Sequence, residues 1–306
     1  MGSSIAITEA RNPKTSAIDT LSSLDIVTLI NDEDAKVATA VRRELPQIAA
    51  AVDIIVPRLR RGGRLLYFGA GTSGRLGVLD ASEMAPTYGT APELVQGYIA
   101  GGDLALRRSV EEAEDDPEAG AQVVREAGVN EADVVVGITA SGSAPWVLGV
   151  MAEAQRRGAA TVALTGNPES PLAHRADVVI APVVGPEVIA GSSRMKAGTA
   201  QKMVLNMLST ATMIRLGRVY GDLMVDVQPA NAKLLRRALR ILQEATGVDA
   251  EAAKRALAAT GNHVKPALVM LLAGVDAGQA HRRLAEAEGF VRRAALRESP
   301  VWKEFD

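Results

Sequence analysis

Five short apolar runs, separated mainly by helical stretches, constrain the fold of this chain more than any other feature. The runs cover residues 65–68, 94–100, 134–138, 161–165 and 178–181. Residues 134–138 read Val-Val-Val-Gly-Ile without alternation of apolar and polar side chains, which is typical of a strand buried on both faces. Strands that alternate with helices predict an α/β fold with a doubly wound parallel sheet.

Helical patterns flank this region on both sides. An apolar stripe over residues 21–30 continues over 37–59, and beyond residue 222 only helical periodicity remains, with breaks at Gly247, Gly261 and Gly274. We therefore predict N-terminal helices in residues 1–50, the α/β domain in 51–221 and an all-helical region in 222–306. A long helix is predicted to end near Leu216, with Ser192 or Ser193 as its N-cap.

Composition excludes several classes of function. The net charge is −2 and only 3% of residues are aromatic, which argues against nucleic acid as a partner. The chain has no cysteine, so disulfides, thiolate catalysis and Cys–zinc sites are excluded. His174, His263 and His281 lack metal-ligand spacing, so no metal site is expected. Without a bilayer-length apolar run or an N-terminal signal, we expect a cytoplasmic protein with no membrane contact.

Small polar residues follow three of the predicted strands. They are Gly71-Thr72-Ser73, Thr139-Ala140-Ser141-Gly142-Ser143 and Thr165-Gly166-Asn167. Ligands of open α/β sheets bind at the carboxyl ends of the strands, so these loops should converge. Thr72 and Ser73 bring two hydroxyls and several backbone N–H groups to a helix N-terminus, where the helix dipole favours an anion. The sequence therefore predicts a phosphate pocket at this edge.

The same loop also matches a dinucleotide fingerprint. Gly69-Ala-Gly-Thr-Ser-Gly74 fits G-x-G-x-x-G after a strand. That interpretation requires an acid at the end of the second strand, and Glu93 instead precedes the next apolar run. The hydroxyls in the middle of the loop favour a terminal phosphate over a dinucleotide.

Carboxylates are the main candidates for chemistry. No G-x-S-x-G nucleophile motif occurs. Glu83 follows the Gly/Thr/Ser loop by two to three helical turns, although by itself it fits an acid at the end of a solvated helix equally well. Residues 111–116 form an acidic run whose pattern does not single out one acid. Residues 192–194 fit a helix cap as readily as a ligand site.

Long specific strings connect this chain with a known family. They are Thr8–Pro13, Ile18–Ser22, Ile30–Asp34, Gly69–Glu83, Glu93–Gly97, Glu112–Asp115 and Gly185–Lys202. With them the chain resembles N-acetylmuramic acid 6-phosphate etherases over nearly its whole length. The Gly-Ser-Ser-Arg-Met-Lys core of the last string is also shared with glucokinase regulatory proteins.

The resemblance implies a sugar-isomerase (SIS) domain, a homodimer and a C-terminal region ending in a UBA-like bundle. It implies a carbon–oxygen lyase that cleaves the ether between D-lactate and C3 of the sugar, in bacterial recycling of peptidoglycan sugar. Mapped by motif, Glu83 is the catalytic acid and Glu114 the base, and no metal or organic cofactor is needed. The residues implied to hold the 6-phosphate and sugar hydroxyls, together with Thr72 of the same loop, are Ser73, Ser141, Ser143, Ser193 and Arg194.

One position departs from the family pattern. Family members often carry Arg-Thr after the Ser141-Gly142 pair, and this chain has Ser143-Ala144. A guanidinium is absent there, which predicts weaker substrate binding unless Arg75 or Lys196 compensates.

Two alternatives from other classes remain open. A sugar-phosphate aldose–ketose isomerase would use the same fold, and turnover of fructose 6-phosphate without lactate release would favour it. A non-catalytic sugar-phosphate sensor like the glucokinase regulators is about twice this length, so chain length argues against it.

Overall fold

The structure is a computed structural model that describes residues 7–110, 112–227 and 231–296. Contacts divide the chain into two units. Unit 1 comprises residues 1–83 and 92–210, and unit 2 comprises residues 84–91 and 211–306. The three-part division predicted at residues 50 and 221 stays a prediction, and its outer ends (1–6 and 297–306) lie outside the described residues.

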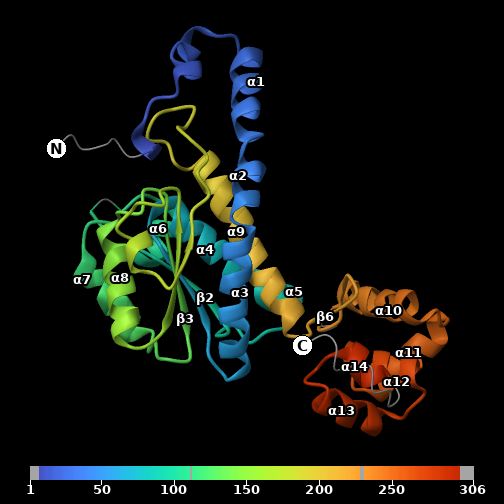
Figure 1. The fold of residues 1–306 in the computed structure, drawn as a ribbon. Coiled ribbons are helices and arrows are strands. Elements are labelled where there is room, and N and C mark those ends of the chain that lie inside the picture. The colour runs from blue at the N-terminus through green and yellow to red at the C-terminus, as the bar shows by residue number, and fades with distance from the viewer. Residues whose placement is uncertain (1–6, 111, 228–230, 297–306) are drawn as a thin grey trace. The chain divides into compact units, whose positions relative to one another are not determined.

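A five-stranded sheet forms the centre of unit 1 (Figure 1). Its strands are β1 (Leu65–Gly69), β2 (Val95–Ile99), β3 (Val134–Thr139), β4 (Ala160–Thr165) and β5 (Val178–Ile180). The strand order is β2-β1-β3-β4-β5, and every pairing is parallel. All five apolar runs of the sequence therefore form strands, and the predicted α/β fold with a doubly wound parallel sheet is confirmed.

Helices cover both faces of this sheet. Leu66 and Phe68 pack on one face against Trp146 and its neighbours in α7 (Pro117–Glu126) and α8 (Pro145–Arg156). On the other face the hydroxyl of Tyr67 donates a hydrogen bond of 3.0 Å to Asp80 in α4 (Gly71–Ser82). Gly77 of α4 allows this approach, because a Cβ there would lie 3.0 Å from the Tyr67 Cβ. The strands are thus buried on both faces, which explains their unbroken apolar runs.

The N-terminal part of unit 1 is helical. It comprises the short 3-10 helices η1 (Ile7–Glu9), η2 (Pro13–Thr15) and η3 (Ile18–Thr20), followed by α1 (Ser23–Asp34), α2 (Val37–Arg43) and α3 (Leu45–Arg60). Ser22 caps α1 by accepting a hydrogen bond from the Asp25 N–H. The remaining short elements of unit 1 are α6 (Gly102–Arg107) and η4 (Ala173–Arg175).

The long helix α9 (Lys196–Arg215) begins at a different cap from the one predicted. The buried carboxylate of Glu187 accepts hydrogen bonds from the backbone N–H groups of Lys196 (3.1 Å) and Ala197 (2.9 Å). The expectation that Ser192 or Ser193 caps this helix is therefore wrong. A carboxylate is the stronger partner, because its charge also interacts favourably with the helix dipole.

A buried ion pair joins α9 to α1. The Lys196 ammonium lies 2.7 Å from Glu33, and the two side chains are only 1% and 3% exposed. Lys36 pairs with the other oxygen of the same carboxylate. These contacts place the start of α9 against the N-terminal helices.

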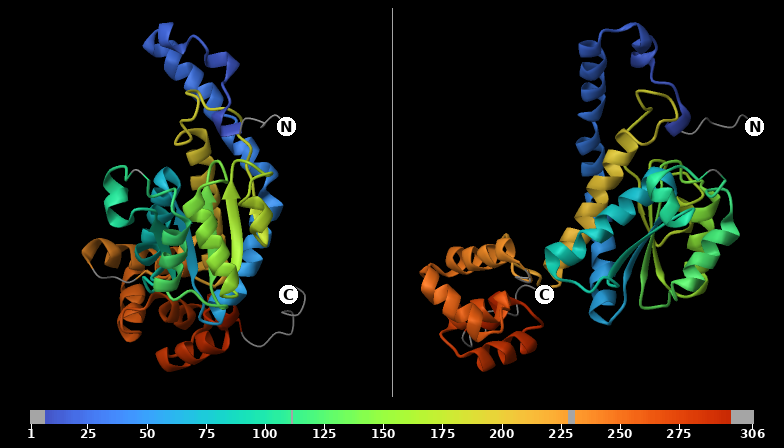
Figure 2. Two further views of the ribbon diagram at one scale, coloured as in Figure 1. Left: turned by 90° about the vertical axis from the view of Figure 1, so that its left-hand side faces the viewer. Right: turned by 180° about the vertical axis from the view of Figure 1, so that it is seen from behind.

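Unit 2 is mainly helical (Figure 2). It contains α5 (Met84–Tyr88), the hairpin strands β6 (Val219–Tyr220) and β7 (Leu223–Met224), and α10 (Ala232–Thr246), α11 (Ala250–Ala259), α12 (Val264–Ala273), α13 (Ala277–Glu286) and α14 (Val291–Ala295). Asn231, Asp249 and Asp276 cap α10, α11 and α13. Leu242, Leu257, Leu268 and Leu284 belong to one apolar core. The likeness of its end to a UBA bundle stays a prediction.

Among the described residues, no helix is both long enough and apolar enough to cross a membrane.

Candidate active site

The predicted phosphate loop forms the start of α4, directly after β1. Gly69 and Gly74 make the tight turn possible, because a Cβ on Gly69 would lie 2.7 Å from the Gly74 nitrogen. Thr72 and Ser73 lie in the first turn, whose N-terminus has no side-chain cap. The uncapped backbone N–H groups are therefore available to an anion, as the sequence predicts.

Ser73 is held by α9. Its buried hydroxyl donates a hydrogen bond of 2.9 Å to Oε1 of Gln201. The Gln201 Nε2 is buried and has no hydrogen-bond partner among the described residues. Gln201 thus fixes the Ser73 rotamer and keeps an unused donor beside the loop.

Ser193 lies near the start of α4, and Gly198 is in contact with both. A Cβ on Gly198 would lie 3.3 Å from Thr72 Cγ2 and 3.6 Å from the Ser193 carbonyl oxygen. The Gly198 N–H also donates to that carbonyl at 3.0 Å. The structure therefore brings Thr72, Ser73 and Ser193 together, whereas Arg194 is exposed.

Ser141 and Ser143 place a second cluster of hydroxyls in the loop after β3. The hydroxyl of Ser141 accepts hydrogen bonds from the Ser143 hydroxyl (3.0 Å) and the Ser143 N–H (3.2 Å). Gly142 has a φ of +75°, and a Cβ there would lie 2.1 Å from Ser170 Oγ. The loop thus requires glycine at this position.

The two hydroxyl-bearing loops follow neighbouring strands. β1 pairs with β3 in parallel, and Gly69 at the end of β1 is opposite Ile138. Both loops therefore leave the same edge of the sheet, where open α/β folds bind their ligands. The sequence predicts this common edge for these two loops and for Thr165-Gly166-Asn167, which follows β4 beside β3.

Glu83 lies at the other end of α4. The helix has 12 residues, so Glu83 is roughly 18 Å from the phosphate loop at the usual rise. Its side chain is exposed and lines a cavity of about 240 Å³ with Asp80 and Lys202. Within one chain, helix geometry thus separates Glu83 from the loop that precedes it.

Glu114 lies in an acidic loop between α6 and α7. Its carbonyl oxygen accepts a 2.9 Å hydrogen bond from the Trp146 N–H, which fixes the loop on α8. The residue is exposed as a whole, but partial burial of the carboxyl group, together with the charge of Asp115, raises the pKa of Glu114.

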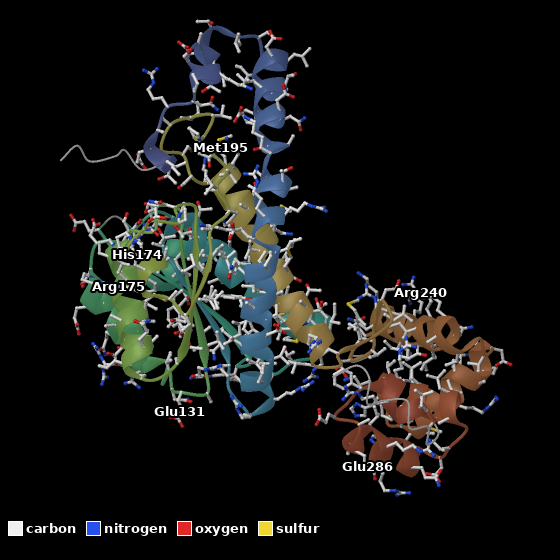
Figure 3. All side chains as sticks on the ribbon, viewed as in Figure 1. Glu131, His174, Arg175, Met195, Arg240 and Glu286 are labelled. Atoms are coloured by element: carbon white, nitrogen blue, oxygen red, sulfur yellow. The ribbon has the colours of Figure 1, made fainter. Side chains whose placement is uncertain are left out.

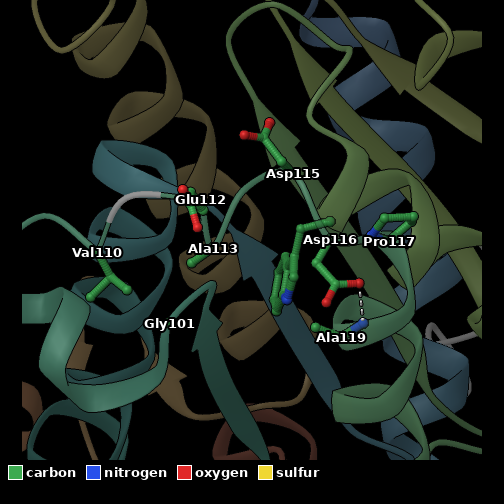
Figure 4. A pocket seen from close by; sticks show the side chains of 9 residues that line it. Gly101, Val110, Glu112, Ala113, Asp115, Asp116, Pro117 and Ala119 are labelled. Atoms are coloured by element: carbon green, nitrogen blue, oxygen red, sulfur yellow. Dashed lines mark hydrogen bonds between the residues drawn. The ribbon is translucent and has the colours of Figure 1, made fainter.

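The acidic loop borders a cavity of about 620 Å³ (Figure 4). Its lining includes Glu112, Asp115 and Asp116, and Asp116 caps α7 through the N–H groups of Glu118 and Ala119. This cavity does not include Glu83. Neither this cavity nor the one beside Glu83 is lined by both predicted catalytic acids.

Sequence reasoning missed three polar residues near the site. Gln201 holds Ser73, Lys202 lines the Glu83 cavity, and Asp80 accepts hydrogen bonds from Asn206 (2.7 Å), Ser209 (3.1 Å) and Tyr67. Burial raises the pKa of Asp80 despite these bonds. A usable signal existed for Gln201, because this polar residue shares a helical face with the buried Ala197 and Val204.

Metal-ligating residues do not cluster here. Within 7–110, 112–227 and 231–296 no group of three His, Asp or Glu side chains is arranged to hold a metal ion. The polar groups of the site are hydroxyls, carboxylates, amides and cations, which suit proton transfer and phosphate binding.

Comparison with known proteins adds to this geometry. Residues 47–155 match the glucokinase regulatory protein N-terminal SIS domain, and residues 111–211 match the SIS domain. An N-acetylmuramic acid 6-phosphate etherase of Symbiobacterium thermophilum is 61% identical over 88% of this chain and 89% of its own length. The etherase of Edwardsiella ictaluri is 56% identical over 94% of this chain and 96% of its own length.

A solved structure is similar to this chain at a lower level. The phosphoheptose isomerase from Francisella tularensis is 20% identical, covers 63% of this chain and 98% of its own, and superposes with a TM-score of 0.48. No function follows from similarity at that level.

Proposed function

Since the chain belongs to the family of N-acetylmuramic acid 6-phosphate etherases, we infer that it cleaves the C3 lactyl ether of N-acetylmuramic acid 6-phosphate. The products are N-acetylglucosamine 6-phosphate and D-lactate, so the enzyme is a carbon–oxygen lyase. The observation that carries this inference is the high identity over nearly the full length of these relatives. We further propose that it acts in the cytoplasm, in the recycling of peptidoglycan sugar.

We propose that Glu114 is the base and Glu83 the acid. Opening of the sugar ring exposes the C1 aldehyde, which acidifies the proton on C2. A carboxylate removes this proton, the electron pair forms the C2–C3 double bond, and the C3–O bond breaks while the acid protonates the leaving lactate oxygen. Water then adds to the unsaturated aldehyde at C3. The raised pKa of Glu114 supports its role, because it makes the ionised carboxylate a stronger base.

We propose that the hydroxyl loops bind the sugar 6-phosphate. Thr72, Ser73 and Ser193 would contact the phosphate at the uncapped start of α4, and Ser141 and Ser143 would contact it from the β3 loop. Arg194, exposed beside this cluster, would supply the positive charge.

We propose that two copies of the chain complete each active site. The length of α4 keeps Glu83 away from its own phosphate loop, whereas the acid from a second copy can approach it. Leu79, one turn before Glu83, is 50% exposed, and Leu24 of α1 is 72% exposed. In the proposed dimer a second copy would cover these two side chains.

The decisive experiment is a lactate assay with the purified chain and N-acetylmuramic acid 6-phosphate. Glu83→Gln and Glu114→Gln should each abolish lactate release and leave binding of N-acetylglucosamine 6-phosphate nearly unchanged. Glu118→Gln, an exposed acid that pairs with Arg125, is the matched control and should keep full activity. Absence of lactate with the unmodified chain would refute the etherase function.

Mixing the two inactive variants tests the shared site. In a mixed dimer, one site would contain both intact acids if they come from different copies, so roughly a quarter of the unmodified activity should return. If both acids of a site belong to one chain, the mixture stays inactive and the two-copy proposal fails, while the etherase function remains.

A further inference from the structure

A cavity in unit 2 is separate from every residue placed in the reaction above. It has a volume of about 290 Å³ and lies between residues 225–227, α12 and α13. Its charged and titratable lining residues are Arg218, Asp226, His263, Lys265 and His281. All of them belong to unit 2, so the cavity does not depend on the position of unit 1.

Positive charge exceeds negative charge in this cavity. Arg218 Nη1 lies 3.2 Å and Lys265 Nζ 2.6 Å from the same atom, Oδ2 of Asp226. One carboxylate thus serves two cations, which leaves a formal excess of one positive charge before either histidine is counted. Burial lowers the pKa of Lys265, and the charge of Asp226 opposes that effect. The Lys265 side chain is only 13% exposed, so solvent compensates this excess poorly.

Hydrogen-bond donors also exceed acceptors. A guanidinium has five N–H donors and an ammonium has three. Apart from the contacts with Asp226, neither Arg218 nor Lys265 has a hydrogen-bond acceptor among the described residues. Within the described residues these spare donors therefore have no further acceptor, and a bound anion can supply one.

Two of the three histidines of the chain line the same cavity. His263 immediately precedes α12, and its ring makes no capping hydrogen bond to that helix. His281 lies on α13 and is exposed. Each imidazole can donate a hydrogen bond to a bound anion without leaving a structural role.

We propose that this cavity is a second anion site, which binds a phosphate group. A dianionic phosphate offsets the excess positive charge and offers oxygens to the guanidinium fork, the ammonium and the imidazoles at once. The volume, at the lower end of that of ligand cavities, selects a small ion or the phosphate end of a larger molecule. Free phosphate and the phosphate of a sugar are the two sources of this chemistry.

Phosphate binding can be followed by the NMR signals of the histidine rings. In ¹H–¹³C NMR spectra of the full chain, titration with inorganic phosphate should shift the ring signals of His263 and His281 in a saturable manner with one dissociation constant. His174, in η4 of unit 1, reports on a different part of the chain (Figure 3). Sodium chloride at matched ionic strength should not reproduce the shifts. A parallel titration with N-acetylglucosamine 6-phosphate distinguishes the two sources by the tighter constant.

Lys265→Met tests the assignment. Removal of a charge-assisted contact should weaken phosphate binding at His263 and His281 by about tenfold or more. Lys254→Met removes an exposed lysine of α11 paired with Glu251, and should change the constant less than about twofold. Circular dichroism and lactate release check that each variant is folded.

His281→Asn is an independent variant at an exposed position, and it should weaken the phosphate response of His263. If His263 and His281 show no saturable shift, or if all three histidines shift alike with sodium chloride, the anion site does not exist. An unchanged constant in folded Lys265→Met also overturns the proposal.

Discussion

The buried pair of Glu33 and Lys196 allows a quantitative prediction of stability. Hydrogen bonds from Lys196 and Lys36 and the charges of both lysines outweigh the opposing effect of burial, and the pKa of Glu33 falls from 4.5 to about 2. A difference of this size between folded and unfolded chain corresponds to about 3 kcal/mol in favour of folding at pH 7. Loss of the charge in Glu33→Gln also leaves Lys196 buried beside a neutral amide, and breaking such pairs costs about 3–5 kcal/mol.

The pH dependence of this contribution has a defined sign. A carboxyl group whose pKa is lower in the folded chain stabilises it fully above pH 4.5, and the contribution disappears as the pH falls toward 2. The difference in unfolding free energy between the unmodified chain and Glu33→Gln should therefore be about 3 kcal/mol at pH 7 and about 1.4 kcal/mol at pH 3.

Urea unfolding followed by tryptophan fluorescence measures this difference. Trp146 is buried in unit 1 and reports alone when Trp302 is replaced by Phe. Glu118→Gln is the control, since its carboxylate is 78% exposed and pairs with Arg125 at 2.5 Å, and it should cost less than about 1 kcal/mol. A Glu33→Gln chain within 1 kcal/mol of the unmodified one at pH 7, or a difference that does not shrink on acidification, would refute the reasoning.

Three further predictions concern the site. Since the pKa of Glu114 is raised and a base must be ionised, kcat/KM should fall on the acid side at a higher pH than an ordinary glutamate predicts, as a pH profile of lactate release will show. Gly142→Ala should raise KM at least about tenfold, because its Cβ would meet Ser170 at 2.1 Å; an unchanged KM would contradict the role of the β3 loop. Asp80→Ala should cost about 3 kcal/mol in urea unfolding by leaving three donors without their acceptor, whereas a cost under 1 kcal/mol would show that the network relaxes.

The sheet could be predicted from the sequence because its signal is local. The unbroken apolar composition of residues 134–138 is enough to predict a buried strand. The loops at Thr72 and Ser141 follow strands whose pairing fixes a common edge. The cap of α9 could not be predicted in this way. Glu187 reaches the helix from nine residues upstream, and nothing in the local pattern distinguishes it from the nearer Ser193.

The placement of Glu83 shows a second limit of prediction from the sequence. Sequence distance from Thr72 is short, but a helix converts it into separation along one axis. The role of Gln201 was equally hidden, because its partner Ser73 lies 128 positions earlier in the chain. Contacts between distant segments decide these details, and a single sequence carries them only weakly.

The division of unit 2 into two segments has a consequence for biosynthesis. Residues 84–91 belong with 211–306, and Gly89 fits against Asp226 so closely that a Cβ would lie 2.4 Å from the Asp226 oxygen. During translation, residues 84–91 leave the ribosome long before residues 211–306 are synthesised. Met84 and Tyr88 are both buried in the finished fold, so they stay exposed to solvent until then. A gene fragment that stops at residue 210 would make this exposure permanent.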